Sequence, residues 1–155
     1  MRKAGAAALM MIVVGTSPDA SGSDRVRAYE IRNGREIPNS LIGVAGDWEL
    51  GRRVYFNRTL AGCSGCHGSP GGPGAQPDVG VEPASSLAGI ADRLPEGLIR
   101  TWLIAPELIA AERSGHSYYR VGQRDDPLDP RFGETRLSAT EIEGLIAYLL
   151  RQKGN

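Results

Sequence analysis

The clearest pattern of hydrophobic and polar positions lies in the last eighteen residues, SATEIEGLIAYLLRQKGN. Apolar residues recur there at the spacing of one helical face: Ile142, Leu145, Ile146 and Leu149. Ser138 and Glu141 form a Ser-x-x-Glu capping box at the start of the segment. Arg151, Lys153 and Gly154 suit its C-terminal end, where cations and glycine are favoured. The pattern predicts an amphipathic C-terminal helix.

Two further segments have helical spacing. Asp47 is a suitable N-cap for a helix over about 48–59, whose apolar positions fall roughly on one side: Leu50, Val54 and Phe56. The segment LPEGLIRTWLIAP begins with Pro95 at a first-turn position and ends at Pro106. Its apolar residues also follow a helical period: Leu98, Ile99, Trp102 and Leu103. The next stretch, PELIAAER, is expected to add one or two turns.

The rest of the chain lacks regular patterning. Residues 68–86 and 114–137 are rich in turn residues, and neither strand alternation nor an internal repeat is present. The predicted class is mostly α, with helices separated by long loops. With 21 glycines, 10 prolines and 6% aromatic residues, the core is thin, so a bound cofactor would add needed apolar surface. Equal numbers of basic and acidic residues, 18 of each, offer no basic surface for nucleic acid or anionic lipid.

The N-terminus has the pattern of a secretory signal peptide. Arg2 and Lys3 precede an apolar run from Ala4 to Val14, which is too short to span a bilayer. We expect residues 1–22 to be removed on export to the periplasm, although an uncleaved anchor is the alternative. The expected organisation is then an extended arm at 23–46 and one folded domain at 47–153. All three methionines lie within the signal peptide.

The motif CSGCH contains both cysteines of the chain, Cys63 and Cys66, followed by His67. A disulfide between the cysteines is one interpretation in an exported protein. A thioredoxin-type redox pair is disfavoured because no βαβ pattern surrounds the motif. A zinc site would need all the soft ligands of the chain, including His116, and adjacent Cys66 and His67 suit a tetrahedron poorly.

Covalent attachment of one haem c (heme c) explains the motif best. Two thiols three residues apart can form thioethers with the two vinyl groups on one porphyrin edge, and the next histidine can then bind the iron. The small residues Ser64 and Gly65 allow the backbone to lie close to the ring. The predicted fold is therefore a class I cytochrome c-like fold. In that fold the N- and C-terminal helices cross at a glycine and an aromatic residue, and Gly51 and Tyr148 are candidates. An ordinary half-buried tyrosine is the alternative for Tyr148.

Four segments outside the motif cover most of residues 37–150 and read IPNSLIGVAGD, SSLAGIADRLPEGLIRTWLIAPE, SYYRV and FGETRLSATEIEGLIAYLL. Together they resemble the SoxX family, the small haem subunit of the SoxAX complex of sulfur-oxidising bacteria. The resemblance implies an electron-transfer subunit, without catalytic residues of its own, of an L-cysteine S-thiosulfotransferase complex. The SoxA partner joins thiosulfate to a cysteine of the carrier SoxYZ, and SoxX passes the electrons to a small acceptor cytochrome. It also implies a heterodimer contact with SoxA, for which the arm at 23–46 is a candidate; disorder is the alternative.

The chain departs from this family at the second iron ligand. SoxX proteins place a methionine just before the xYYR loop, where this chain has Gly115, followed by His116. The sequence therefore predicts that His67 and His116 both bind the iron, with an open or water-bound sixth position as the alternative. Tyr118 and Tyr119 are candidates to pack on the haem edge or to hydrogen-bond a propionate. Arg120 is a candidate propionate partner, and ordinary loop packing is the alternative for all three.

Three rival functions follow from these alternatives. A free-standing class I cytochrome c would carry electrons without a SoxA partner. A haem-based ligand-binding protein would follow if His116 does not bind the iron. A zinc-stabilised binding module would follow if CSGCH holds metal instead of haem.

Overall fold

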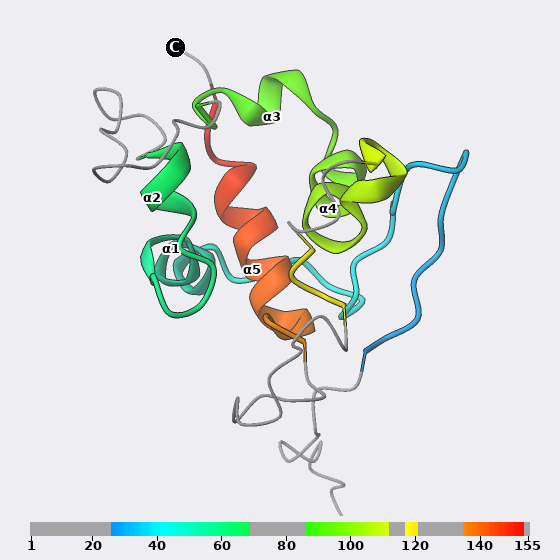
Figure 1. Cartoon of the computed structure of the whole chain (residues 1–155), viewed down its shortest axis with the longest axis horizontal. Coiled ribbons are helices and arrows are strands. Elements are labelled where there is room, and N and C mark those ends of the chain that lie inside the picture. The colour runs from blue at the N-terminus through cyan, green and yellow to red at the C-terminus, as the bar shows by residue number, and fades with distance from the viewer. Residues whose placement is uncertain (1–25, 69–85, 112–116, 121–134, 154–155) are drawn as a thin grey trace, which may run out of the picture.

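The computed structural model describes residues 26–68, 86–111, 117–120 and 135–153, and helices are its main regular elements (Figure 1). They are α1 (Trp48–Phe56), α2 (Cys63–His67), α3 (Ile90–Arg93), α4 (Glu96–Ile104), the 3₁₀ turn η1 (Pro106–Leu108) and α5 (Ala139–Leu149). In the described part of the chain the only β-type pairing is one isolated bridge between Arg32 and Glu36. The mostly α class is thus confirmed. The predicted loops at 68–86 and 114–137 lie largely outside the described residues.

The C-terminal helix is confirmed with its capping box. The Ser138 hydroxyl accepts from the Glu141 N–H at 3.1 Å, and the Glu141 carboxylate accepts from the Ser138 N–H at 2.9 Å. The four predicted apolar positions are at most 4% exposed, and Ile37, Val54, Tyr55 and Leu137 complete the centre of the core. Helix α5 is therefore the element around which the other described segments pack.

The other predicted helices differ in detail. Helix α1 ends at Phe56, because the side chain of Asn57 accepts from the Thr59 N–H and hydroxyl and so favours a turn. Pro95 is the N-cap of α4 and precedes its first turn. Within PELIAAER, Pro106–Leu108 form the 3₁₀ turn η1, and residues 112–113 lie outside the described residues. The short helix α3 had no signal in the sequence.

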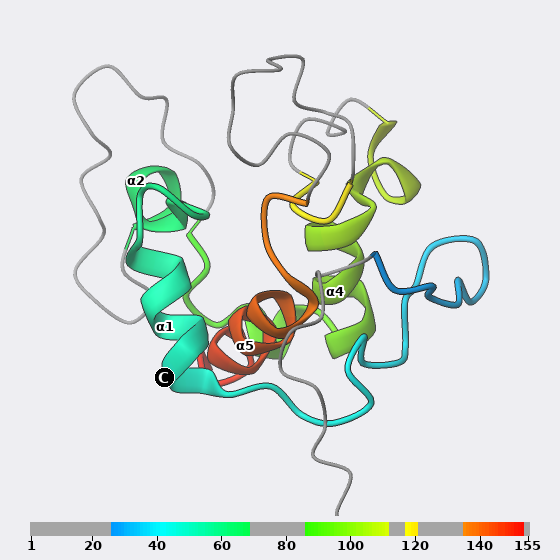
Figure 2. The same ribbon diagram turned by 90° about the horizontal axis from the view of Figure 1, so that it is seen from below.

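Helices α1 and α5 lie against each other, as Figures 1 and 2 show from two directions. A Cβ added to Gly51 would overlap the backbone carbonyl of Gly144, so the two backbones touch. Tyr148 packs beside this crossing, with its ring centroid 5.3 Å from that of Tyr55 and 6.4 Å from that of Phe56. The glycine and the aromatic residue expected at the crossing are both there, and the atoms of α5 nearest to an added Cβ at Gly51 belong to the backbone of Gly144 and Leu145.

We predict that Gly51→Ala destabilises the protein by roughly 1–3 kcal/mol, the range for overpacking a close contact. The overlapping atoms belong to a helix backbone, so no rotamer change can relieve them and the helices must separate. Urea unfolding followed by circular dichroism measures the effect. Arg53→Ala, at an exposed position of the same helix, is the control and should leave the unfolding midpoint unchanged. Equal midpoints for both variants would contradict the close crossing.

The segment before α1 runs along α4, as both views show (Figures 1 and 2). The Ile37 N–H donates to the Thr101 hydroxyl at 3.0 Å, and the Ile37 side chain is fully buried. Leu41 is 7% exposed, and its N–H donates to the carboxylate of Glu143 at 2.9 Å. Ile37 and Leu41 therefore anchor the second half of the expected arm in the core, while Val44 in the same half is 65% exposed. No described helix is both long enough and apolar enough to cross a membrane.

Candidate functional site

The CSGCH motif forms one short helix, α2, placed directly after the turn that ends α1. Gly62 precedes it with a φ of 62°, in the left-handed region that side chains other than glycine rarely adopt. Gly68 ends it with a φ of 76°. Glycines at both ends thus let a helix of five residues start and stop sharply between two bends. The motif is presented as a compact turn at the end of α1.

The two thiols occupy adjacent positions on one side of this turn, because residues three apart are neighbours on a helix surface. Neither thiol is in a disulfide, which does not support the disulfide interpretation. Cys63 is 8% exposed, and burial raises the pKa of its thiol to about 11, so it is protonated at neutral pH. Cys66 is exposed. Two free thiols followed by His67 are the donor set that one haem c requires, so the residues fit that group.

Tyr55 anchors the end of α2 to α1. Its side chain is fully buried, and its hydroxyl donates to the Gly68 carbonyl at 2.6 Å. Burial raises the pKa of Tyr55 above its usual value, so the hydroxyl stays protonated and remains a donor. The residue after His67 is thereby fixed to the core.

Tyr118 lies beside Cys63. Desolvation and the nearby Cys63 together raise the pKa of Tyr118 to about 12, while a hydrogen bond with Tyr118 lowers the pKa of Cys63. Its backbone is held on both sides, since the Tyr118 N–H donates to the Leu103 carbonyl and the Leu137 N–H donates to the Tyr118 carbonyl, each at 2.9 Å. Of the three residues in the YYR loop, Tyr118 is the one placed next to the CSGCH turn.

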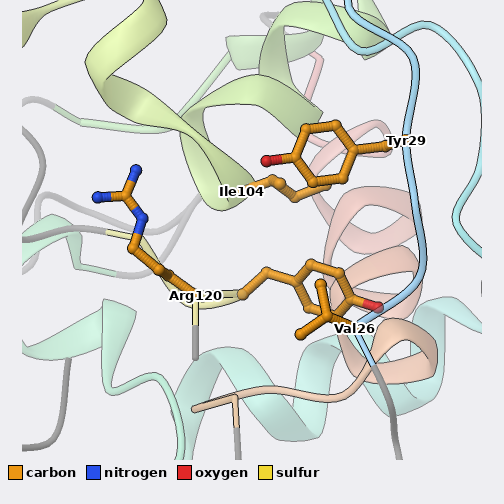
Figure 3. Close-up of a pocket in the computed structure, with 5 residues that line it drawn as sticks. Val26, Tyr29, Ile104 and Arg120 are labelled. Carbon is orange, nitrogen blue, oxygen red and sulfur yellow. The ribbon is translucent and has the colours of Figure 1, made fainter. Parts of the chain in front are cut away.

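Tyr119 and Arg120 lie at a different place, a cavity of about 350 Å³ that is also lined by Val26, Tyr29 and Ile104 (Figure 3). Tyr119 is 2% exposed, and its hydroxyl accepts from the Arg27 N–H at 2.9 Å. Figure 3 shows the guanidinium of Arg120 directed away from Val26 and Tyr29, and it pairs with Glu107. These contacts join the YYR loop to the N-terminal segment and to η1.

His116, the other expected iron ligand, lies outside the described residues. Within the described ranges no three His, Cys, Asp or Glu side chains gather as a metal site, so a zinc site would require residues from outside them. His67 is half-buried at the end of α2.

Two residues near the site had no sequence signal. Tyr55 reaches Gly68, 13 positions away, and Arg136 donates to the Leu60 carbonyl, 76 positions away, at 2.8 Å. Tyr55 follows the apolar position Val54 and reads as a core residue. Arg136 precedes a helix N-cap and reads as a surface residue. Contacts between distant segments create both roles, so no local motif marks them.

Comparison with known proteins gives a match among solved structures but none among family models or curated proteins. A scan against protein-family models gives no match, and a search of curated proteins gives no significant match. Among solved structures, a crystal structure of SoxXA from P. pantotrophus matches with a TM-score of 0.62 and 27% sequence identity. The match covers 81% of this chain and 94% of the matched chain.

Crossed terminal helices, with the Cys-x-x-Cys-His turn directly after the first, define a class I cytochrome c-like fold. Because the match extends over nearly the whole of one SoxXA chain at 27% identity, the likeness includes sequence as well as fold. The chain is SoxX-like in the sense that it is similar in sequence and fold to one chain of SoxXA.

Proposed function

We propose that this chain is a periplasmic mono-haem cytochrome c that acts as the electron-transfer subunit of a complex with a SoxA-type cytochrome. One observation carries the proposal: two free thiols and a histidine share a single turn of a SoxX-like fold. By the family resemblance, the partner joins thiosulfate to the cysteine of a SoxYZ-type carrier. This chain receives the electrons released and passes them to a small acceptor cytochrome. It contributes no catalytic residue of its own.

The residues of the CSGCH turn hold the cofactor. Cys63 and Cys66 would hold the haem through two thioether bonds, each formed by addition of one S–H across one vinyl group, and the imidazole of His67 would bind the iron. When bound, haem c supplies a one-electron redox centre. Tyr55 keeps the end of the turn fixed to α1, and Tyr118 shields the Cys63 side from water. Of the three candidates in the YYR loop, Tyr118 is the proposed contact of the cofactor, because Tyr119 and Arg120 line the separate cavity beside the N-terminal segment.

His116 is the proposed second iron ligand. No methionine follows residue 11, so removal of the signal peptide leaves a protein without the thioether ligand of SoxX relatives. A second imidazole favours ferric iron more than a thioether does, so the reduction potential should lie below that of a His/Met relative.

The N-terminal region carries the proposed export signal and partner surface. Residues 1–22 form a signal peptide, residues 23–46 an arm, and residues 47–153 the cytochrome domain. The described part of the arm exposes large apolar side chains, with Val26 at 42%, Tyr29 at 37% and Ile31 at 44%. Exposed apolar side chains on one segment support its assignment as the surface for a SoxA-type partner.

Co-expression of the full chain with a tagged SoxA-type subunit, in a host that matures c-type cytochromes, tests the proposal. The periplasmic complex should contain this chain, and the chain should stain for haem after denaturing electrophoresis with one haem per polypeptide. A red chain that elutes without the tagged subunit would favour the free-standing carrier. A colourless chain would rule out the cytochrome function.

The same preparation tests the iron ligand. The ferric protein should be low-spin and should lack the sulfur-to-iron charge-transfer band of Met-ligated cytochromes. His116→Ala should convert it to a high-spin form. A low-spin spectrum that persists unchanged in His116→Ala would show that His116 is not the ligand.

A further inference from the structure

Arg136 links three segments that surround the CSGCH turn. It lies just before Ser138, the N-cap of α5. Its Nε–H donates at 2.8 Å to the Leu60 carbonyl, in the turn that leads into α2. Its guanidinium also lies over the Tyr118 ring, 5.2 Å from the centroid. A planar guanidinium can make both contacts at once, whereas an ammonium group lacks the flat face and the fork of donors.

Hydrogen bonds of the residues on either side of Arg136 fix its position beside the YYR loop. The Leu137 N–H donates to the Tyr118 carbonyl at 2.9 Å, and the Thr135 hydroxyl donates to the Leu137 carbonyl at 2.6 Å. Leu137 is fully buried, and Thr135 is 7% exposed. Arg136 is thus an exposed residue between two buried ones, and its backbone is fixed beside the YYR loop.

The positive charge of Arg136 lies on the Cys63 side of the site. The acceptor of the Arg136 Nε–H, the Leu60 carbonyl, is three residues before Cys63 in the chain, and the guanidinium also contacts the ring of Tyr118. Within the described ranges, no Asp or Glu side chain forms an ion pair with Arg136. The guanidinium is therefore an uncompensated positive charge, among the described residues, next to Cys63.

We propose that Arg136 is a positioning residue of the haem site, and that its charge raises the reduction potential of the haem attached at Cys63. The inference rests on the proposed cytochrome function. Oxidation adds a positive charge to the iron, and a nearby guanidinium disfavours that charge by Coulomb repulsion. The contacts with Leu60 and Tyr118 hold the turn before α2 and the loop residue beside Cys63 in one arrangement.

Spectroelectrochemical titration of the holoprotein tests the charge effect. Arg136→Gln should shift the reduction potential downward, and the shift should shrink as salt is added because Arg136 is exposed. Arg136→Lys should keep most of the wild-type potential but melt at a lower temperature, because the planar contacts with Leu60 and Tyr118 are lost. Arg35→Gln removes one charge at an exposed position in the turn at 32–36 and is the matched control.

An unshifted potential in Arg136→Gln would overturn the proposal. Equal shifts in Arg136→Gln and Arg35→Gln would overturn it as well, because the effect would then come from the net charge of the protein. A melting temperature of Arg136→Lys equal to that of the wild type would overturn the positioning role. Failure of the cytochrome function is seen separately, as a wild-type chain that carries no covalent haem.

Discussion

Replacing both Cys63 and Cys66 with alanine is expected to abolish covalent haem attachment completely. The two sulfurs are the only thiols of the chain, so no other residue can form the thioether bonds. Haem staining after denaturing electrophoresis should show no band for this variant, while an antibody still detects the polypeptide. The yield should also fall, because the chain loses the apolar surface that a bound haem adds to a thin core.

The single variants Cys63→Ala and Cys66→Ala should differ in their effect on the free energy of unfolding. Cys63 is buried and Cys66 is exposed. Cys63→Ala therefore leaves a small void beside Tyr118 and should cost about 1 kcal/mol in the free energy of unfolding, whereas Cys66→Ala should cost little beyond its thioether bond. Ser64→Ala, in the same helical turn, is the control and should retain one haem per chain. Wild-type amounts of covalent haem in the double variant would disprove attachment at CSGCH.

Much of the fold follows from local patterns. Helix α5 has both a capping box and an uninterrupted apolar stripe, and both signals act within a few residues. Helix α4 is similarly bounded, by Pro95 and Pro106. Helix α1 was predicted to extend three residues too far, because the side chain of Asn57 favours a turn that apolar spacing does not report.

The candidate site was predictable only in part. Cys63, Cys66 and His67 are adjacent in sequence, so their motif shows the chemistry directly. The supporting residues Tyr55 and Arg136 depend on contacts between segments that fold from distant parts of the chain, and sequence spacing cannot reveal these. The hydrogen-bond acceptors of both side chains are backbone carbonyls, so no second side chain in the sequence marks either contact.

The packing of the segment before α1 was likewise not predictable from the local sequence. Residues 23–37 are polar and aperiodic, which indicated an extended arm. Ile37 and Leu41 are nevertheless buried, because a charged pair from α4 and α5 supplies hydrogen-bond partners for the backbone around them. A pair of charged residues separated by 43 positions reads in the sequence as two surface residues.

Arg100 and Glu143 form this buried pair. Arg100 is fully buried and Glu143 is 2% exposed. The carboxylate of Glu143 accepts from Arg100 Nε at 2.9 Å and from Nη2 at 3.0 Å, and also accepts from the Leu41 N–H. Arg100 Nη1 donates to the carbonyls of Ile37 and Pro38, both at 3.1 Å. The pair therefore joins α4, α5 and the segment before α1.

Replacing Glu143 with alanine is expected to destabilise the protein by roughly 3–5 kcal/mol, the range for removing one partner of a buried ion pair. Burial lowers the pKa of Arg100, but hydrogen bonds with Glu143 and Glu96 raise it above its usual value, so the guanidinium stays charged and would be buried without its main partner. The Leu41 N–H would also lose its acceptor. Urea unfolding of the holoprotein, followed by circular dichroism, measures the loss. Glu141→Gln, on the same helix, keeps an acceptor for the capping box and is the control.

A double variant distinguishes the contribution of the Arg100–Glu143 pair itself from the cost of leaving one charge buried without its partner. Arg100→Met combined with Glu143→Leu removes both charges together and replaces them with apolar side chains, so its cost should be far smaller than the sum of the two single costs. Hydrogen exchange at the amides of residues 37–41 should be faster in Glu143→Ala than in the wild type, because the Leu41 N–H no longer has its acceptor. Additive costs together with unchanged exchange at these amides would show that the pair does not hold the segment before α1 in place.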